Sequence, residues 1–138
     1  MLWLLDTCVI SEVVRKAPDM RVQAWLAEHG DDAALSAPTV GEIQYGIARK
    51  SIGRERHLLE LWFDGLRAQF AARMLVTDVP VWLAFGRLKA SLETIGRRQD
   101  DLDLLIAATA TVHRLTLVTR NTRHFIDSGL PLHNPWLE

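Results

Sequence analysis

The chain has 138 residues, close to the commonest size of a protein domain, and this length predicts a single domain over residues 1–138. A hydrophobic fraction of 49% and a net charge of −1 exclude a highly charged disordered chain and a protein that coats nucleic acid through bulk positive charge. No apolar run spans a membrane, no signal-peptide pattern opens the chain, and the single cysteine forms no disulfide within it, so we expect a cytoplasmic protein.

The first half of the chain predicts two short buried strands and three helices. The run Leu2-Trp3-Leu4-Leu5 is wholly apolar, as in a strand that is covered on both faces. In chain order we expect a strand at 2–5, helices at 7–16 and 19–29, a weak strand at 33–36, and a helix with Pro38 in its first turn that runs to about residue 50.

The second half continues the alternation. It predicts a long amphipathic helix at 54–74, a short strand at 75–77, a helix capped by Asp78, a helix at 102–112, a strand at 116–119, and a tail around 131–136. Short apolar strands separated by helices indicate an α/β fold: a three-layer α/β/α domain around a short, mainly parallel sheet. In such sheets ligands bind beyond the carboxyl ends of the strands.

Four polar residues stand in apolar surroundings near that predicted edge. Asp6 follows the first strand, Glu42 borders the apolar stripe of the third helix, Asp103 opens a stretch without charge, and Asn121 follows the strand that ends near Thr119. Each has a structural alternative: a helix cap for Asp6, a surface position for Glu42, a first-turn acid for Asp103 and a turn for Asn121.

Together these residues point to a metal site. Three carboxylates that converge without a cation would repel one another and raise their pKa values. Mg2+ relieves that repulsion and prefers oxygen ligands, whereas no pair of histidines has the spacing of a zinc site.

Four segments carry a resemblance to a known family. The segments are LLDTCVISE, LSAPTVGEIQYGIA, DLDLLIAATATVHRLTLVTRN and the closing NPW. In this order they resemble the PIN-domain nucleases, specifically the VapC-type toxins of type II toxin–antitoxin systems and their FitB-like relatives. The resemblance runs from the first strand almost to the last residue.

The resemblance implies a PIN-like fold and an endoribonuclease that depends on Mg2+ or Mn2+. It assigns the metal to Asp6, Glu42, Asp103 and Asn121, the first three of which are also the catalytic residues. It adds Thr7 and Thr119 as hydroxyl neighbours. Where the family often has Asn or Ser this chain has Cys8, and Asn121 stands where many PIN domains have a fourth acid.

The resemblance also implies partners. These are an RNA substrate of the tRNA or rRNA class, a VapB-like antitoxin whose helix lies in a groove, and a second copy of the chain in a homodimer; a membrane is not among them. Six cations near the expected ligands are candidates for contacts with RNA phosphates: Arg49, Lys50, Arg97, Arg98, Arg120 and Arg123.

Other functions fit the sequence less well. A thiol phosphatase would use Cys8 as its nucleophile, but Arg15 comes one position too late for that motif. A haloacid-type phosphatase needs a second Asp where Cys8 stands, and a receiver domain needs adjacent acids after the first strand. A PIN-fold binding module with weak catalysis, which acts through its antitoxin or a DNA-bound complex, stays open as the alternative.

Overall fold

Five short parallel strands form the central sheet of the protein. The computed structural model describes residues 1–137, and in it the strands are arranged in the order β3-β2-β1-β4-β5. The strands are β1 (Trp3–Leu5), β2 (Ala33–Ser36), β3 (Met74–Leu75), β4 (Thr116–Val118) and β5 (Leu132–His133). The first strand of the chain therefore lies in the middle of the sheet, between β2 and β4.

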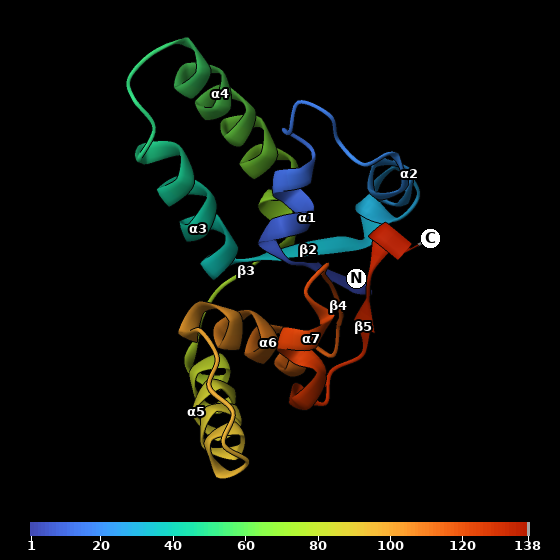
Figure 1. The fold of residues 1–138 in the computed structure, drawn as a ribbon, viewed down its shortest axis with the longest axis vertical. Helices are drawn as coiled ribbons and strands as arrows, with labels where there is room; N and C mark the ends of the chain where they lie inside the picture. The colour runs from blue at the N-terminus through green and yellow to red at the C-terminus, as the bar shows by residue number, and fades with distance from the viewer. Residues whose placement is uncertain (138) are drawn as a thin grey trace.

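Helices cover both faces of this sheet, as the predicted three-layer fold requires. They are α1 (Thr7–Glu12), α2 (Met20–His29), α3 (Ala37–Ala48), α4 (Arg54–Gln69), α5 (Val79–Thr94), α6 (Asp101–His113) and α7 (Thr122–Phe125). Helices α1 to α4 lie on one side of the sheet and α5 to α7 on the other (Figure 1). None of the helices within residues 1–137 has the length and apolar character needed to cross a membrane.

Alternate residues of the strands pack into two separate parts of the core, one on each face of the sheet. Leu5 and Val118 belong to a cluster with α1 to α4, whereas their neighbours Leu4 and Leu117 pack with α6 and α7 on the opposite face. This alternation follows from strand geometry, because successive side chains point to opposite faces. Since both faces of β1 are covered, its side chains are apolar on both sides, which explains the unbroken run at the start of the chain.

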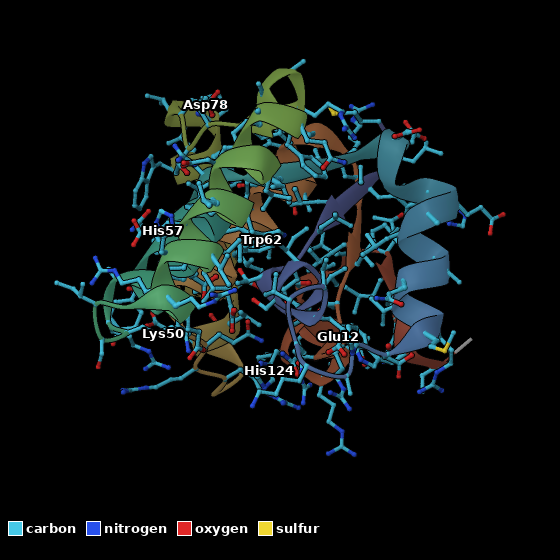
Figure 2. All side chains as sticks on the ribbon, turned by 90° about the horizontal axis from the view of Figure 1, so that it is seen from above. Glu12, Lys50, His57, Trp62, Asp78 and His124 are labelled. Atoms are coloured by element: carbon cyan, nitrogen blue, oxygen red, sulfur yellow. The ribbon has the colours of Figure 1, made fainter. Side chains whose placement is uncertain are left out.

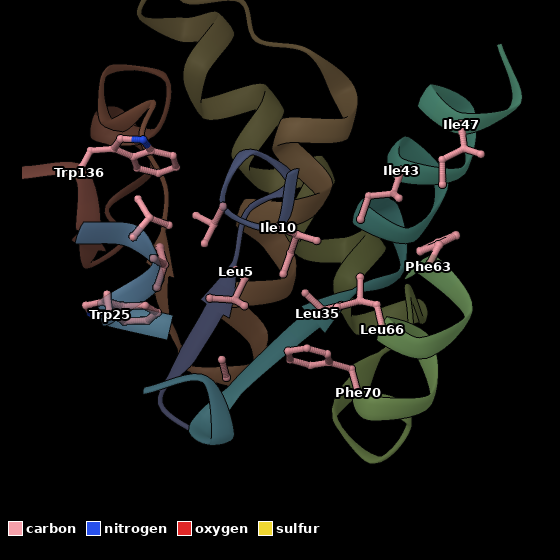
Figure 3. Packing of buried hydrophobic residues seen from close by; sticks show 14 residues of the cluster. Leu5, Ile10, Trp25, Leu35, Ile43, Ile47, Phe63, Leu66, Phe70 and Trp136 are labelled. Carbon is pink, nitrogen blue, oxygen red and sulfur yellow. The ribbon is translucent and has the colours of Figure 1, made fainter. Parts of the chain in front are cut away.

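The larger cluster is built around aromatic side chains that reach in from the helices. Trp25 and Trp136 close one end of it, and Phe63 and Phe70 of the α4 segment close the other (Figure 3). A third small cluster joins α5 to α6. The layer of α1 to α4 is therefore fixed to the sheet through many buried contacts around the strand that leads to Asp6.

The first helix is shorter than the sequence predicts. We expected a helix at 7–16, but α1 ends at Glu12. The carboxylate of Glu12 is only 4% exposed; it accepts a hydrogen bond from the backbone N–H of Asp19 at 2.8 Å and contacts Arg15 at 3.3 Å. A buried acid that bonds the start of α2 draws the chain into a turn, which local helix propensity cannot predict.

Several further boundaries also differ from the prediction. The helix expected at 54–74 ends at Gln69, because a short 3-10 turn at Ala71–Arg73 leads into β3, which pairs with β2. Strand β3 covers two residues rather than 75–77, and β4 ends at Val118 rather than at residue 119. Strand β5 and helix α7 were not predicted, since elements of two and four residues are too short for a hydrophobic period.

Candidate active site

Asp6 lies at the carboxyl end of β1, where the chain leaves the middle of the sheet. From β1 the chain builds β2 and β3 on one side and later returns to build β4 and β5 on the other. This reversal is a topological switch point, where the loops that leave two neighbouring strands diverge and open a crevice. The backbone N–H of Asp6 donates to the carbonyl of Val118 at 2.9 Å, which ties it to β4 across that crevice.

The carboxylate of Asp6 is buried and accepts two short hydrogen bonds. Its Oδ1 accepts from the backbone N–H of Thr7 at 2.8 Å, so Asp6 does cap α1. Its Oδ2 accepts from the hydroxyl of Thr119 at 2.7 Å, and both residues are at most 5% exposed. The helix cap and the ligand were alternatives in the sequence, but the geometry leaves Asp6 able to serve as both.

Glu42 approaches the same place from α3. Its Oε1 accepts a hydrogen bond from the hydroxyl of Thr7 at 2.7 Å, so Thr7 links the helix acid to the residue that follows Asp6. Burial raises the pKa of Glu42, and the charge of Asp6 raises it further, whereas the Thr7 hydrogen bond acts in the opposite direction. Glu42 is therefore neither a free surface acid nor an isolated one.

Asp103 completes the acidic group from the first turn of α6. Burial raises its pKa from 3.8 to about 6, and the charges of Asp6, Asp100 and Glu42 add to this shift. His124 of α7 works against it, with Nδ1 at 3.7 Å from Asp103 Oδ2. Asp103 is thus close enough to the other acids for their charges to raise its pKa, as expected for residues that share one site.

Asn121 is only loosely connected to these acids. Asn121 is exposed, and its backbone N–H donates to the Thr119 hydroxyl at 3.0 Å. It directly precedes α7, but its side chain forms no capping hydrogen bond to that helix. The structure therefore brings together Asp6, Thr7, Glu42 and Thr119 through hydrogen bonds and Asp103 through charge, and Asn121 through its backbone alone.

Two residues near the acids were not predicted as part of the site. Asp100 caps α6 by accepting from the backbone N–H of Leu102 at 2.8 Å, and its charge raises the pKa of both Glu42 and Asp103. The place of Asp100 in the run Asp100-Asp101-Leu102-Asp103 was a signal of concentrated charge. His124 had no such signal, since it depends on the unpredicted helix α7.

Cys8 does not have the properties of a catalytic thiol. Burial raises the pKa of its thiol from 9.0 to about 11, and the neighbouring charge of Asp6 contributes in the same direction. Its Sγ lies 3.6 Å from Asp6 Oδ2 and 3.8 Å from the Thr119 hydroxyl. Reactive cysteines have lowered pKa values, so this environment is unfavourable for the thiol-phosphatase reading.

The donor chemistry of the acids fits a hard divalent cation. All the candidate ligands are oxygens, and a bound cation would remove the repulsion that raises the pKa values of Glu42 and Asp103. As the side chains stand, no three Asp, Glu, His or Cys residues within residues 1–137 form a group that could hold a metal ion. A metal would therefore need side-chain rotations at the rim of the site.

Residues 3–127 match the profile of the family described as PIN domain, so this chain belongs to the PIN-domain family. The family resemblance and the α/β/α fold predicted from the sequence are both confirmed. The chain is similar to the toxin FitB of Neisseria gonorrhoeae, with 38% identity over 135 residues, 96% of this chain and 97% of that protein. It is also 36% identical to a VapC ribonuclease of Sinorhizobium fredii, over 96% of each chain.

Solved structures give the same relationship. A structure of FitAB bound to a DNA fragment contains a chain that superposes with a TM-score of 0.92 at 36% identity, over 98% of this chain and 96% of that one. A VapBC2 complex from Rickettsia felis, bound to DNA from its promoter, gives a TM-score of 0.84 at 25% identity and covers 97% and 98% of the two chains.

Proposed function

We propose that this protein is a metal-dependent endoribonuclease and the toxin of a type II toxin–antitoxin module, with Mg2+ or Mn2+ as its cofactor. The main support is the electrostatic coupling of Asp6, Glu42 and Asp103 at the switch point of a PIN-domain sheet. The relatives add to this support, since several carry the names of ribonucleases or of toxins.

In this proposal Asp6 and Asp103 hold the metal directly, and Glu42 either joins them or orients the attacking water. When bound, the cation polarises a phosphodiester oxygen and makes a coordinated water a better nucleophile. Thr119 fixes one oxygen of Asp6 through its 2.7 Å hydrogen bond, which leaves the carboxylate a restricted set of directions. Thr7 does the same for Glu42. These two hydroxyls position the acids and do not react.

The decisive experiment is RNA cleavage by purified protein with added Mg2+ or Mn2+. Asp6→Ala and Asp103→Ala should each abolish cleavage while the circular dichroism spectrum stays unchanged. Asp101→Asn is the matched control, because Asp101 is an exposed acid in the same helical turn as Asp103 and pairs with Lys89 at the surface. Cleavage that survives EDTA, or full activity in either alanine variant, would remove the basis of the proposal.

The proposed protein partner is a VapB-like antitoxin. A hollow of about 200 Å3 opens between α1, α2 and α4, and its walls are mainly apolar: Leu5, Ile10, Val13, Leu26, Gly30, Trp62, Leu66, Gln69 and Phe70. An amphipathic helix from a partner can bury its apolar face in such a hollow. An arginine from that partner would then reach the acids and pair with them in place of the metal.

Homodimerisation is part of the same proposal, and the first candidate surface is the apolar part of the α4 segment, which the sequence shows at Trp62, Phe63, Leu66 and Phe70. The α4 side chains Phe63 and Leu66, and Phe70 just beyond the helix, are buried in the core of the single chain. Exposed apolar side chains lie at other positions of α4, where Leu58 is 51% and Leu61 is 55% exposed, and on α5, where Val79 is 70% and Trp82 is 51% exposed. We propose that a cytoplasmic dimer acts on tRNA or rRNA, which light scattering and RNA sequencing after cleavage would test.

A further inference from the structure

A second hollow adjoins the acidic site on the side of α6 and α7. Its volume is about 250 Å3. Its walls come from the loop between α5 and α6, the first turn of α6 and helix α7: Arg97, Arg98, Gln99, Asp100, Asp103, Arg123 and His124. Asp103 therefore belongs both to the group of acids and to the wall of this hollow, which is continuous with the site where the metal is proposed.

The cations of this hollow differ from the other cations near the acids. Neither Arg98 nor Arg123 forms an ion pair within residues 1–137, and both are exposed. The Nε of Arg97 lies 3.2 Å from Asp127 Oδ2, which holds its guanidinium in place at the wall. The hollow thus has one anchored guanidinium and two that are free to take a new partner.

The other cations that the sequence offered for RNA binding do not line this hollow, and each already contacts another residue. Lys50 forms an ion pair with Glu55 at 3.0 Å, at the far end of α3. Figure 2 labels Lys50, just beyond the end of α3, and His124 of α7, which lines the hollow. The guanidinium of Arg49 lies over the ring of Tyr45, and that of Arg120 over the ring of Trp136. Of the six candidates for RNA contacts that the sequence could not rank, three therefore share one hollow.

The backbone fixes where the first two of these arginines lie. Helix α5 ends as Gly96 adopts a φ of 73°, a left-handed conformation that favours glycine. The N–H of Arg97 then donates back to the carbonyl of Leu92 at 2.8 Å. This closed turn directs the chain away from the axis of α5 and places Arg97 and Arg98 in the wall beside Asp103.

The charges of the hollow suit the backbone of a nucleic acid that passes the acids. A phosphodiester next to Asp103 and Asp100 would be repelled by their charge, whereas guanidinium groups donate strong, charge-assisted hydrogen bonds to phosphate. Because the whole chain has a net charge of −1, binding to RNA has to come from such a local cluster rather than from bulk charge.

We propose that this hollow binds the phosphate that neighbours the scissile one in the RNA, held by Arg97, Arg98 and Arg123. The proposal rests on the proposed ribonuclease function and assigns its backbone contacts to one side of the acids. It makes these arginines binding residues that position the strand, with no part in proton transfer. Phosphate contacts of this kind fix the register of a strand and do not read its sequence.

The test is the salt dependence of RNA binding. A single-stranded RNA oligonucleotide is titrated with the Asp6→Asn protein in EDTA at a series of KCl concentrations, so that cleavage does not interfere. Arg98→Ala and Arg123→Ala should each weaken binding about tenfold. Each should also reduce the slope of log Kobs against log salt by about 0.7, the value for one lost phosphate contact on a single strand. Lys50→Ala should change neither quantity.

Kinetics supply a second measurement in the otherwise wild-type protein. Arg98→Ala should raise KM and leave kcat within about twofold, and Arg98→Lys should restore most of the salt slope, since it keeps the charge. An Arg98→Ala/Arg123→Ala protein that is folded, yet has unchanged affinity and slope, would overturn the inference, and so would a loss of antitoxin binding alone. Absence of cleavage by the wild-type protein would instead refute the proposed function.

Discussion

Replacing Thr119 by valine tests how the site holds its central acid. The change is nearly isosteric, and it removes the hydroxyl that donates to Asp6 Oδ2 at 2.7 Å. Asp6 is 5% exposed and Thr119 is fully buried, so water does not easily replace the lost donor. The N–H of Asn121 also loses its acceptor, the same hydroxyl at 3.0 Å.

The expected cost follows from the charge of the acceptor. A hydrogen bond to an ionised group contributes about 1.5–3 kcal/mol, against about 0.5–1.5 kcal/mol for a neutral pair. Thr109→Val is the matched control, because Thr109 is equally buried but its hydroxyl donates to a neutral carbonyl, that of Leu105, at 2.7 Å. Thr119→Val should therefore reduce the free energy of unfolding by at least 1 kcal/mol more than the control does.

Urea denaturation in EDTA and again in excess Mg2+ measures both costs. If the proposed metal binds Asp6, part of the Thr119→Val penalty should disappear in Mg2+, since the cation then compensates the carboxylate. The control should be insensitive to Mg2+. Equal losses for the two variants in EDTA would show that the Thr119 hydroxyl does not support a charged Asp6, and the reasoning about the site would fail.

Four other outcomes follow from the structure. Because the pKa of Asp103 is raised to about 6, the folded metal-free protein binds more protons than the unfolded chain between about pH 4 and 6. The free energy of unfolding should therefore fall as the pH rises through that window. In NMR, the titration of Asp103 should shift to lower pH when Mg2+ is added. Cys8→Ser should keep most of the cleavage activity, and an inactive variant that still binds the metal would revive a thiol mechanism. Gly96→Ala should destabilise the protein by about 1–2 kcal/mol in urea denaturation, since only its φ of 73° opposes the new methyl group, whereas Gly65→Ala in the middle of α4 should stabilise it by about 0.5–1 kcal/mol. Trp62→Ala should weaken antitoxin binding in calorimetry without affecting RNA cleavage, and an unchanged affinity would place the antitoxin elsewhere.

The sequence predicted the layers of the fold because burial leaves a strong pattern. Strands covered on both faces are largely apolar, and the amphipathic helices show apolar stripes, so four of the five strands and six of the seven helices within residues 1–137 could be located. The predicted helix and strand boundaries were wrong where a contact between residues distant in sequence overrides the local conformational preference. Glu12 ends α1 by bonding Asp19, and β3 exists only because it pairs with β2.

The acids of the candidate site could be predicted from the sequence, but the residues that interact with them could not. Asp6 and Asp103 stand out as charges in apolar runs, whereas the influence of Asp100 and His124 depends on how α6 and α7 approach the sheet. The six basic residues could not be ranked from sequence, since ion pairs such as Lys50–Glu55 and the wall of the second hollow arise only in three dimensions.

The position of β1 in the middle of the sheet makes the geometry of Asp6 depend on the last part of the chain. Asp6 is made almost first, but its partner Thr119 is 113 residues further along the chain. Strand β4, which pairs with β1, is likewise made near the end. A nascent or prematurely terminated chain therefore lacks one side of the crevice and cannot hold Asp6 in its folded geometry. If the proposed function holds, a chain that ends before β4 would lack the assembled site, and only the complete chain would need to be inhibited.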